Sequence, residues 1–389
     1  MSKLDILVKQ INKQYKEDIA SRGIPERHFE KIPFSSPLAN YMTYGGIPRG
    51  RIVEFAGEEN SGKTTTALDI VANAQKLFKK EYGEEIKNLQ KLQDKKQATK
   101  EQQTRLEYLQ KERGIKKVVY CDCENTLDEE WAEKLGVNTN EMILLKPMSQ
   151  SAEEIFEMLL QMMDTDEVGL VVIDSLGVMI SQQAYDKDMT EKTMGGIAAA
   201  LTLFSKKAEL LCTKYDCTLI GINQLREDMS GFGQTITPGG RGWKHNCSLR
   251  LVFKKGDYID ENGNTLKRSA TSPAGNEINI AILKTKVCRP DRKNGYYTLT
   301  YTNGVDKISD MIELACFYDI IQKGGSWFSI INIETGEIMQ MDTLSKDENG
   351  NPIMSDLKFQ GKSALLEYLR NDTKLTNLIY KQVMQKLEE

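Results

Sequence analysis

Residues 55–68 read FAGEENSGKTTTAL and carry the strongest structural signal in the chain. The stretch satisfies the spacing G-x-x-x-x-G-K-[ST] with Gly57, Gly62, Lys63 and Thr64. A β-branched run, RIVEF (51–55), precedes it, and a helix-forming run, ALDIVA (67–72), follows it. A strand, a glycine-rich turn and a helix, in this order, are the context in which such a motif binds phosphate.

Each part of this motif has a physical task. The glycines let the backbone curl so that successive N–H groups point at phosphate oxygens, and the helix presents its positive N-terminal end to the same charge. Lys63 would neutralise phosphate charge, and the Thr64 hydroxyl would ligate Mg²⁺. The remaining residues of the predicted nucleotide site are Glu58, Glu59, Asn60, Ser61 and Thr65. The alternative is an ordinary strand-to-helix turn with a surface lysine, and the motif by itself leaves the use of the bound nucleotide open.

Length and composition set wider limits. The chain has 389 residues, 40% hydrophobic and 28% charged, which is typical of a soluble protein with two or three domains. Seven cysteines without a C-x-x-C pair and only two histidines argue for reduced, buried thiols rather than a zinc site. The formal net charge of −4 means that nucleic acid would have to bind at local basic patches.

The N-terminal residues MSKLDILVKQINKQYK (1–16) place apolar side chains among charged ones. This pattern predicts an amphipathic helix and lacks the apolar core of a signal peptide. No run approaches the length of a membrane span. The expected location is therefore the cytoplasm, with no membrane partner.

Residues 80–116 are mostly charged or amide side chains, with sparse apolar residues at Ile86, Leu89, Leu92, Leu106 and Leu109. A narrow apolar stripe on each half predicts two helices packed as a protruding hairpin that turns near residues 97–102. The segment is either a solvated insertion without chemistry or an arm that binds a partner.

Several apolar runs alternate with helical stretches after the motif. The strand-like runs are VVYCDCE (118–124), LVVIDS (170–175), TLIGINQ (218–224), LRLVFKK (249–255) and INIAILKTK (278–286), and helical stretches include 152–163 and 195–214. This alternation is typical of an α/β fold whose parallel sheet is covered by helices on both faces.

Polar residues stand where three of these strands end, which is where ligands of such sheets bind. Asp174 ends one strand and is placed to hold Mg²⁺ beside Thr64, although a lone strand-end aspartate can also cap a helix. Glu124 ends a second strand and is placed to orient and deprotonate an attacking water. Gln224 ends a third strand, where its amide could sense the terminal phosphate. Considered by itself, Gln224 would be interpreted as an ordinary solvated residue at a strand end.

Five segments in order carry a resemblance that covers nearly the whole chain outside 80–116. They are GRIVEFAGEENSGKTTTALDIVANAQ (50–75), DCENTLDEEWAEKLGV (122–137), VVIDSLGVM (171–179), INQLR (222–226) and TPGGRGWKHNCSLRL (237–251). The sequence resembles the bacterial RecA family of strand-exchange recombinases. The resemblance implies a RecA-like ATPase core with a mostly parallel twisted sheet at 35–307, an N-terminal oligomerisation arm of helix and strand at 1–34, and a small α+β C-terminal domain at 308–389.

The resemblance also implies roles around ATP and Mg²⁺. Glu124 matches the family's catalytic glutamate, and Asp128 with Trp131 match positions that contact adenine. Tyr301 matches an adenine-side residue supplied by a neighbouring subunit. Lys284 and Lys286 match two lysines that reach the neighbour's γ-phosphate, as an arginine finger does. Without the resemblance, alternating lysines on a strand would read as surface charges.

Two loops, about 181–196 and 225–241, match the family's DNA loops. Both contain glycine, lack a strand pattern and follow strands of the nucleotide site. The expected DNA-binding residues are Met194, Gly195, Arg226, Ile236, Gly239, Gly240 and Arg241. The implied partners are single-stranded and duplex DNA and further copies of this chain in a helical filament.

The sequence departs from the family pattern in three places. The first loop is acidic. Just after this loop the family usually has a basic residue, but here the position falls among the alanines Ala198–Ala200. The segment 80–116 is inserted relative to the family pattern. Two functions therefore stay open: a DNA-dependent ATPase that carries out homologous pairing and strand exchange, and a RecA-like paralogue that acts as an ATP-switched mediator or scaffold. A hexameric helicase is a weaker third possibility, because the N-terminal pattern is that of the recombinases.

Overall fold

The computed structural model describes residues 3–15, 29–110, 114–186, 196–227, 235–267, 269–346 and 352–388. The chain divides into two units, 1–30 and 31–389. In the first unit, helix α1 spans Lys3–Tyr15 and confirms the predicted N-terminal helix. Its Leu4 side chain is 67% exposed within this chain.

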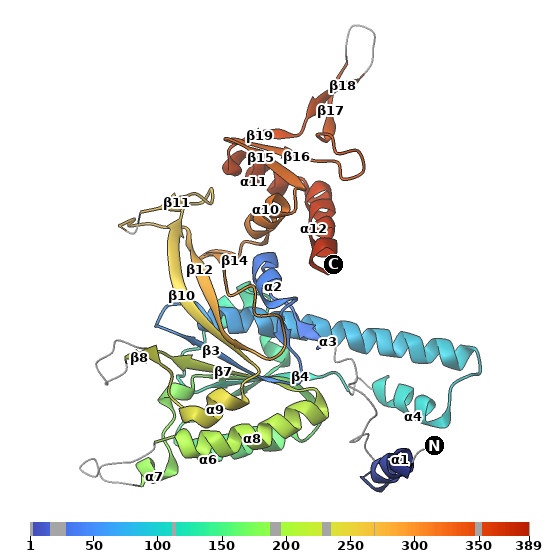
Figure 1. Ribbon diagram of the computed structural model, residues 1–389, viewed down its shortest axis with the longest axis vertical. Helices are drawn as coiled ribbons and strands as arrows, with labels where there is room; N and C mark the ends of the chain where they lie inside the picture. The colour runs from blue at the N-terminus through green and yellow to red at the C-terminus, as the bar shows by residue number, and fades with distance from the viewer. Residues whose placement is uncertain are drawn as a thin grey trace. The chain divides into compact units, whose positions relative to one another are not determined.

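The second unit is built on one ten-stranded sheet (Figure 1). The strand order is β14-β13-β12-β10-β3-β7-β6-β4-β5, and β11 pairs with β10. The strands are β3 (Ile52–Gly57), β4 (Lys117–Asp122), β5 (Met142–Leu145), β6 (Val168–Asp174), β7 (Thr218–Gln224), β10 (Leu249–Ile259), β11 (Thr265–Leu266), β12 (Gly275–Thr285), β13 (Asn294–Thr300) and β14 (Gly304–Val305). The six strands from β10 to β5 in this order pair in parallel, which confirms the predicted α/β fold.

The prediction of a parallel strand was wrong for the run INIAILKTK. This run lies in β12, which pairs antiparallel with β10. The described residues between the two strands, 260–267 and 269–274, form no helix that could make the crossover a parallel pair needs. β12 therefore begins an antiparallel extension of the sheet.

Side chains alternate between two cores on the two faces of the parallel strands. On β4, Val118 and Tyr120 join one core, and Val119 and Cys121 join the other. Because successive side chains of a strand point to opposite faces, a strand buried on both sides reads as a continuous apolar run. This explains why the sequence located these strands well.

Helices cover both faces of this sheet (Figure 1). The helices of this part of the chain are α2 (Pro37–Thr43), α3 (Lys63–Asp94), α4 (Lys100–Leu109), α5 (Glu129–Lys134), α6 (Ala152–Met163), α7 (Gln182–Tyr185), α8 (Ala198–Tyr215) and α9 (Gly240–Asn246), of which α4 packs on α3 and not on the sheet. The predicted helix at 152–163 is confirmed, with Ser151 and Glu154 forming a capping box at its start. Within the described ranges, no helix is long and apolar enough to cross a membrane. All seven cysteines are free, as predicted, and four of them are buried.

The charged segment 80–116 forms a helical hairpin, but its first arm is not a separate helix. α3 runs without a break for 32 residues from the glycine-rich turn to Asp94. The turn covers residues 95–99 rather than 97–102, because Thr99 and Gln102 form a capping box that starts α4 at Lys100. No proline interrupts residues 63–94, so nothing in the sequence ends α3 earlier.

A third core lies in the C-terminal region and contains Met311, Phe328 and Leu365. Its elements are α10 (Lys307–Phe317), β15 (Ile321–Gly324), β16 (Trp327–Ile330), β19 (Lys358–Gln360), α11 (Lys362–Asn371) and α12 (Thr373–Glu388). The remaining short strands are β1 (Lys31–Ile32), β2 (Ile47–Pro48), β8 (Arg226–Glu227), β9 (Thr235–Ile236), β17 (Gln340–Lys346) and β18 (Pro352–Asp356). The domain boundary predicted at 307–308 falls in the first turn of α10 and stays a prediction.

A fully buried carboxyl joins the third core to the rest of the unit. Asp310 of α10 accepts hydrogen bonds from the Ser36 hydroxyl and, over 3.0 Å, from the backbone N–H of Thr298. Burial raises the pKa of Asp310 to about 7, against the lowering effect of these two donors. Between about pH 4 and about pH 7, Asp310 therefore keeps its proton in the native state, whereas the same carboxyl in the unfolded chain, with its ordinary pKa, has released it.

We expect the free energy of unfolding to fall as pH rises from about 4 to about 7, because the native state binds more protons than the unfolded state in this window. Asp310→Asn should remove up to about 4 kcal/mol of this decline, since an amide does not titrate. Urea unfolding of both proteins at pH 5 and pH 8 measures the difference. Equal losses in the two proteins would mean that Asp310 does not titrate in this range.

Candidate functional site

The glycine-rich turn connects β3 to α3 as the motif predicts. Gly57 ends β3, and Gly62, with φ of 89°, directly precedes α3. A Cβ atom on Gly57 would lie 2.5 Å from Ser61 Oγ, and one on Gly62 would lie 2.6 Å from Ile278 Cδ1. Both positions therefore require glycine, and the turn leaves the N-terminal N–H groups of a 32-residue helix facing the loop.

Lys63 folds back over this turn. Its Nζ donates to the Glu58 carbonyl oxygen over 2.6 Å and to Ser61 Oγ over 3.4 Å. Burial lowers the pKa of Lys63, while Asp174 and Glu124 act in the opposite direction. A phosphate in the turn would supply the charge that this buried ammonium lacks.

Thr64 and Asp174 meet as predicted for a magnesium site. The Thr64 hydroxyl donates to Asp174 Oδ2 over 2.8 Å, and the Tyr120 hydroxyl donates to the same oxygen over 2.8 Å. Burial raises the pKa of Asp174, and these two hydrogen bonds oppose that rise. Asp174 is thus held by two hydroxyl donors in a site screened from water.

The donor set fits Mg²⁺, which takes one or two protein oxygens together with substrate phosphates and water. Among the described residues, no group of three or more His, Cys, Asp or Glu side chains could hold a metal ion. A metal here would therefore need phosphate oxygens to complete its shell. Tyr120 was not predicted, because nothing in a buried apolar strand marks one tyrosine as a partner of Asp174.

Glu124 stands beside the same cavity, but not at a strand end. β4 stops at Asp122, whose carboxylate accepts the backbone N–H groups of Thr126 and Leu127 and so fixes a turn. Within this turn, Glu124 Oε1 accepts a hydrogen bond from the Ser175 hydroxyl over 2.6 Å. Ser175 therefore orients Glu124, a role that the sequence did not reveal.

These side chains share one cavity of about 270 Å³ at the carboxyl ends of the parallel strands. Its lining residues are Glu59, Asn60, Lys63, Thr64, Glu124, Asp174, Ser175, Ile222 and Gln224. Gln224 ends β7 directly opposite Gly57 of β3, which places it beside the turn. The cavity combines one cation, two hydroxyls, three carboxylates and two amides from four segments of the chain.

The two positions expected to contact adenine lie near the start of α3. Trp131 Nε1 is 3.4 Å from the Thr65 hydroxyl, to which it donates, and the Asp128 carboxylate accepts the Trp131 backbone N–H. The structure thus places an aromatic ring next to the helix that follows the turn. A purine could stack on this ring.

Tyr301, Lys284 and Lys286 do not lie in this cavity. Tyr301 is 43% exposed, and its hydroxyl donates to Asn276. The ammonium groups of Lys284 and Lys286 donate to the backbone carbonyl of His245 over 2.7 and 3.1 Å, at the end of α9. Burial, and then the charge of Lys286, lower the pKa of Lys284.

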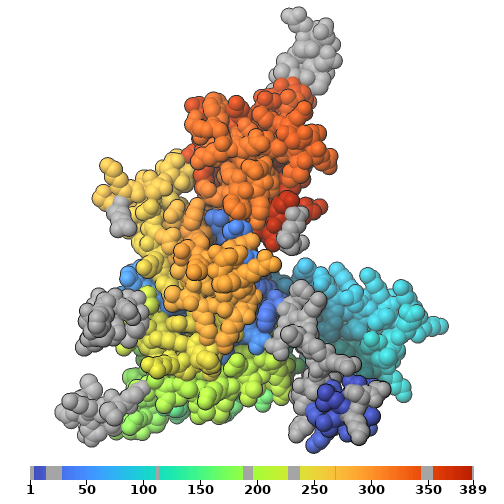
Figure 2. Space-filling model, in the orientation of Figure 1, coloured from blue at the N-terminus to red at the C-terminus, as the bar shows by residue number. Residues whose placement is uncertain are grey.

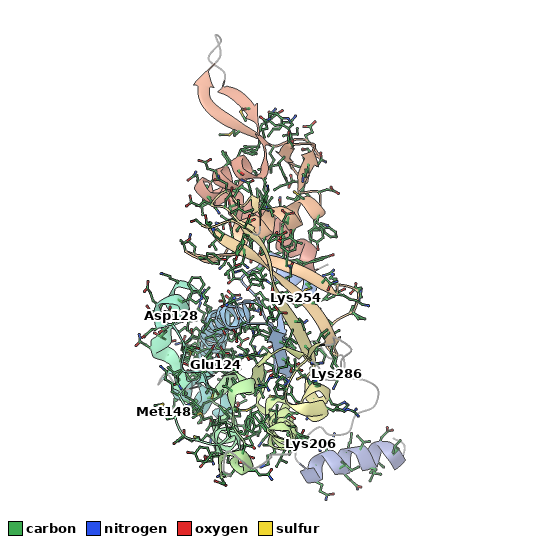
Figure 3. All side chains as sticks on the ribbon, turned by 90° about the vertical axis from the view of Figure 1, so that its left-hand side faces the viewer. Glu124, Asp128, Met148, Lys206, Lys254 and Lys286 are labelled. Carbon is green, nitrogen blue, oxygen red and sulfur yellow. The ribbon has the colours of Figure 1, made fainter. Side chains whose placement is uncertain are left out.

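Strand register shows how far these lysines lie from the turn. Leu249 of β10 pairs with Thr285 on one side and with Val53, near the start of β3, on the other. Gly57 lies four residues further along β3, about 13 Å away in the strand direction. Figure 3 also shows Lys286 well apart from Glu124. The lysines therefore lie near the amino ends of the parallel strands β3 and β10, whereas the nucleotide cavity lies at the carboxyl ends.

A buried polar network that the sequence did not predict lies behind the turn. Glu54 of β3 is fully buried and accepts from Arg250 Nε, Trp243 Nε1 over 3.0 Å and Asn223 Nδ2 over 3.0 Å. Asn223 also donates to the Pro238 carbonyl. The network links β3, β7 and the end of the second predicted DNA loop.

The described ends of the two predicted DNA loops border a second cavity of about 470 Å³. Arg226, Pro238 and Gly239 line it on the side of the second loop, and Ser181 and Gly196 on the side of the first. Part of the second loop has regular structure, since β8 and β9 pair as a short ribbon. This corrects the prediction of a segment without strands.

The other predicted DNA-binding residues that the structure describes lie in β9 and at the start of α9. Ile236 pairs with Arg226 in the ribbon, and Gly239 and Gly240 begin α9 with positive φ angles of 96° and 72°. Arg241 is exposed on the first turn of α9. Met194 and Gly195 lie outside the residues that the structure describes.

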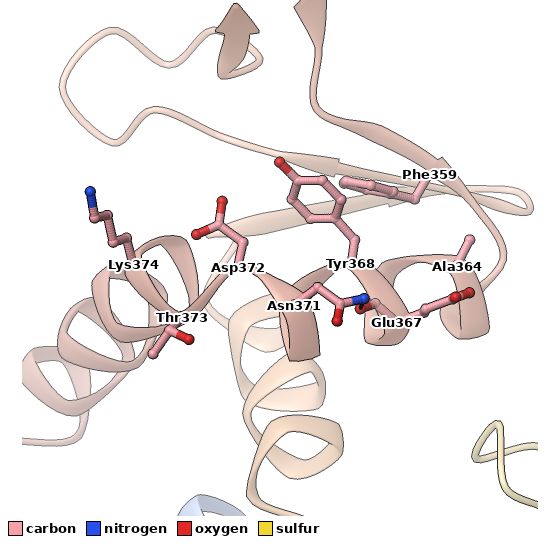
Figure 4. Close-up of a pocket in the computed structure, with 8 residues that line it drawn as sticks. All are labelled: Phe359, Ala364, Glu367, Tyr368, Asn371, Asp372, Thr373 and Lys374. Atoms are coloured by element: carbon pink, nitrogen blue, oxygen red, sulfur yellow. Dashed lines mark hydrogen bonds between the residues drawn. The ribbon is translucent and has the colours of Figure 1, made fainter. Parts of the chain in front are cut away.

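A larger surface pocket of about 760 Å³ lies in the C-terminal region (Figure 4). Tyr368 and Phe359 form one side of it, and Glu367 and Asp372 add two carboxylates against the single cation Lys374. It has no glycine-rich turn at a long helix N-terminus. The phosphate chemistry therefore belongs to the smaller cavity around Lys63.

Comparison with known proteins matches the family model described as the RecA N-terminal domain to residues 2–81 and 99–306. The chain is 31% identical over 341 residues to Protein RecA of Streptococcus sanguinis, covering 86% of this chain and 77% of that one. It is 27% identical over 354 residues to Protein RecA of Mycoplasma mycoides, covering 90% and 82%. For Protein RecA of Leptospira biflexa the identity is 27% over 395 residues, covering 96% and 89%. With a phosphate-binding turn, a paired threonine and aspartate, and a family match over most of its length, this chain belongs to the RecA family.

Proposed function

We propose that this protein is a DNA-dependent ATPase that forms a filament on single-stranded DNA and promotes homologous pairing and strand exchange. The observation that carries the proposal is the single cavity in which Lys63, Thr64, Asp174 and Glu124 converge. The substrate would be ATP, and the cofactor Mg²⁺, held by Thr64 and Asp174 together with the phosphates. The products would be ADP and phosphate.

The residues of the cavity have separable tasks in hydrolysis. The backbone N–H groups after Gly62 and the Lys63 ammonium bind the phosphates, and Trp131 supports the adenine. Bound Mg²⁺ would neutralise charge that develops on the phosphate oxygens. Glu124, oriented by Ser175, would hold the attacking water in line and accept its proton. Gln224 would contact the terminal phosphate from β7.

The same strand offers a route from the nucleotide to DNA. Gln224 and Arg226 are two residues apart in the chain, and Arg226 borders the second cavity. A movement of Gln224 on binding of the terminal phosphate would therefore displace the residues where the second loop begins. Glu54 and Asn223 hold the other end of this loop at Pro238. Two observations thus support coupling between the nucleotide cavity and the second loop: Gln224 and Arg226 are close in the chain, and buried hydrogen bonds of Asn223 fix the loop at Pro238.

The placement of Lys284 and Lys286 supports a site shared between subunits. They lie near the amino ends of the parallel strands, whereas their own cavity lies at the carboxyl ends. Any contact with a γ-phosphate would therefore be made in a neighbouring copy. Tyr301, exposed on the surface, would reach the neighbour's adenine in the same way. A filament is the assembly that repeats such a contact along the chain of subunits.

The test is to measure ATP hydrolysis with and without single-stranded DNA, with electron microscopy of the same mixture, for the wild-type protein and Glu124→Gln. The variant keeps the shape of the side chain and loses the base, so hydrolysis should slow by ~10²-fold or more while ATP and DNA binding persist. Glu129→Gln, at an exposed position of α5, is the matched control.

Two outcomes would count against the proposal. Undiminished turnover in Glu124→Gln would remove this residue from catalysis. Nucleotide-dependent DNA binding without pairing or exchange of strands would instead favour a mediator or scaffold, a function compatible with the inserted hairpin.

A further inference from the structure

The far half of α3 and the helix α4 project from the sheet-and-helix core (Figures 1 and 2). Phe78 is the last buried residue of α3, which continues for 16 residues to Asp94, a length of about 24 Å. The family match omits residues 82–98. The outer turns of α3 and the turn that follows them are therefore an addition of this chain to the part that the family model describes.

The end of this projection is strongly basic. We define the hairpin tip as residues 87–100, which contain five lysines and one aspartate, a net charge of +4 in a chain of net charge −4. The five lysines, all exposed, are Lys87, Lys91, Lys95, Lys96 and Lys100. Lys87 and Lys91 lie on one face of α3, about 6 Å apart, and Lys95 follows four residues later as the first residue of the turn.

The cations nearer the core are neutralised, whereas those of the hairpin tip are not. Lys79 pairs with Glu141 over 2.8 Å, Lys80 with Glu84 over 3.8 Å, and Arg105 with Glu85 over 2.9 Å. In the part of the chain that the structure describes, no ion pair involves a lysine of the hairpin tip. Its positive charge is available to a partner.

The lysines are presented on an ordered support. The turn is fixed by the capping box of Thr99 and Gln102, and Leu106 and Leu109 of α4 are buried. The Arg105 guanidinium also bridges to both oxygens of Glu85 in α3. Because the backbone is already ordered, a partner would bind without the cost of folding this segment.

The composition of the hairpin tip indicates which partner it fits. It contains no aromatic residue and no arginine, the side chains that anchor protein interfaces, whereas lysine is depleted there. The absence of aromatic rings also argues against stacking on the bases of a single strand. Exposed lysines instead suit the uniform negative charge of duplex DNA, which carries one phosphate on each strand for every ~3.4 Å of helix axis.

We propose that the hairpin tip binds the phosphate backbone of duplex DNA without reading its sequence. In Figure 1, α4 lies on the opposite side of the core from α7 and β8, which are described parts of the two predicted DNA loops. The hairpin tip is thus a second DNA contact, separate from those loops. The inference rests on the proposed function in one respect, namely that the natural partner of this chain is DNA.

The test compares Lys91→Gln/Lys95→Gln/Lys96→Gln with two matched variants of the full chain. One carries Lys→Arg at the same three positions and keeps the charge. The other removes three lysines that pair with carboxylates elsewhere, Lys79→Gln/Lys80→Gln/Lys134→Gln, and so has the same net charge. Fluorescence anisotropy with a labelled 40-base-pair duplex and a labelled single strand of equal length, with ATP at several salt concentrations, measures the affinities.

The glutamine variant of the hairpin tip should bind the duplex about 10-fold more weakly, and the slope of log affinity against log salt should fall by about 2 to 3. Its affinity for the single strand should change by less than about 2-fold, and both matched variants should bind as the wild-type protein does. Equal duplex binding by the wild-type protein and the glutamine variant would overturn the proposal, as would a wild-type protein that binds no duplex. Absence of ATP-dependent single-strand binding in the wild-type protein is the separate result that would count against the proposed function.

Discussion

Lys63→Ala is expected to abolish ATP hydrolysis and to lower ATP affinity by ~10²-fold or more. The variant loses the one buried ammonium of the cavity, and a hydrogen bond to a charged group contributes roughly 1.5–3 kcal/mol. The loss for hydrolysis should be larger still, because charge builds up on the transferred phosphoryl group in the transition state. Titration with a fluorescent ATP analogue and a steady-state phosphate assay measure the two effects.

The thermal stability of the nucleotide-free protein should not change with Lys63→Ala. Lys63 is 8% exposed, and burial lowers its pKa, so in the absence of phosphate the charged form is disfavoured where it lies. We therefore expect the thermal midpoint of the nucleotide-free variant to match that of the wild-type protein, whereas stabilisation by added ATP should disappear. Lys79→Ala, on the exposed part of the same helix, should retain both activities. ATP affinity equal to that of the wild-type protein in Lys63→Ala would refute the phosphate-binding role of the turn.

The strands of the core could be predicted because they are buried on both faces and therefore read as apolar runs. The run at 218–224 became β7 with the predicted bounds. The pairing direction of β12 could not be predicted in the same way, because an apolar run looks alike in either direction and only the connection between strands decides it. The length of α3 was also missed, since a change from apolar to charged composition at residue 80 marks the end of burial and not the end of the helix.

In the candidate site, too, some residues could be predicted from the sequence and others could not. Lys63, Thr64 and Asp174 could be predicted because local geometry, a turn before a helix and the end of a strand, places them. Ser175, which orients Glu124, and the buried network of Glu54 could not, because they depend on side chains brought together from distant segments. Such partners carry no spacing that a sequence pattern can reveal.

The second large effect concerns the lysines that lie far from their own cavity. Lys284→Ala/Lys286→Ala should leave ATP binding by an isolated subunit nearly unchanged, because the turn around Lys63 is untouched. It should abolish DNA-stimulated hydrolysis, since cations supplied across an interface stabilise charge on the transferred phosphoryl group and contribute 10³–10⁵-fold in related phosphoryl-transfer enzymes. The wild-type rate per subunit should also rise with protein concentration. Replacing the exposed pair Lys254 and Lys255 of β10 with alanine is the matched control.

Mixing two inactive variants gives the sharper result. In a filament of Lys284→Ala/Lys286→Ala and Glu124→Gln subunits, an interface is complete where the first variant supplies the glutamate and the second supplies the lysines. Random mixing in equal amounts creates this arrangement at about a quarter of the interfaces, so up to about a quarter of the wild-type ATPase should return on single-stranded DNA. We expect the lysines to act in trans, because strand register sets them about 13 Å along the sheet from their own turn. If the two variants are shown to assemble together and no activity returns, the lysines act within their own subunit or only support the end of α9, and the case for a shared site in a filament loses its main mechanistic support.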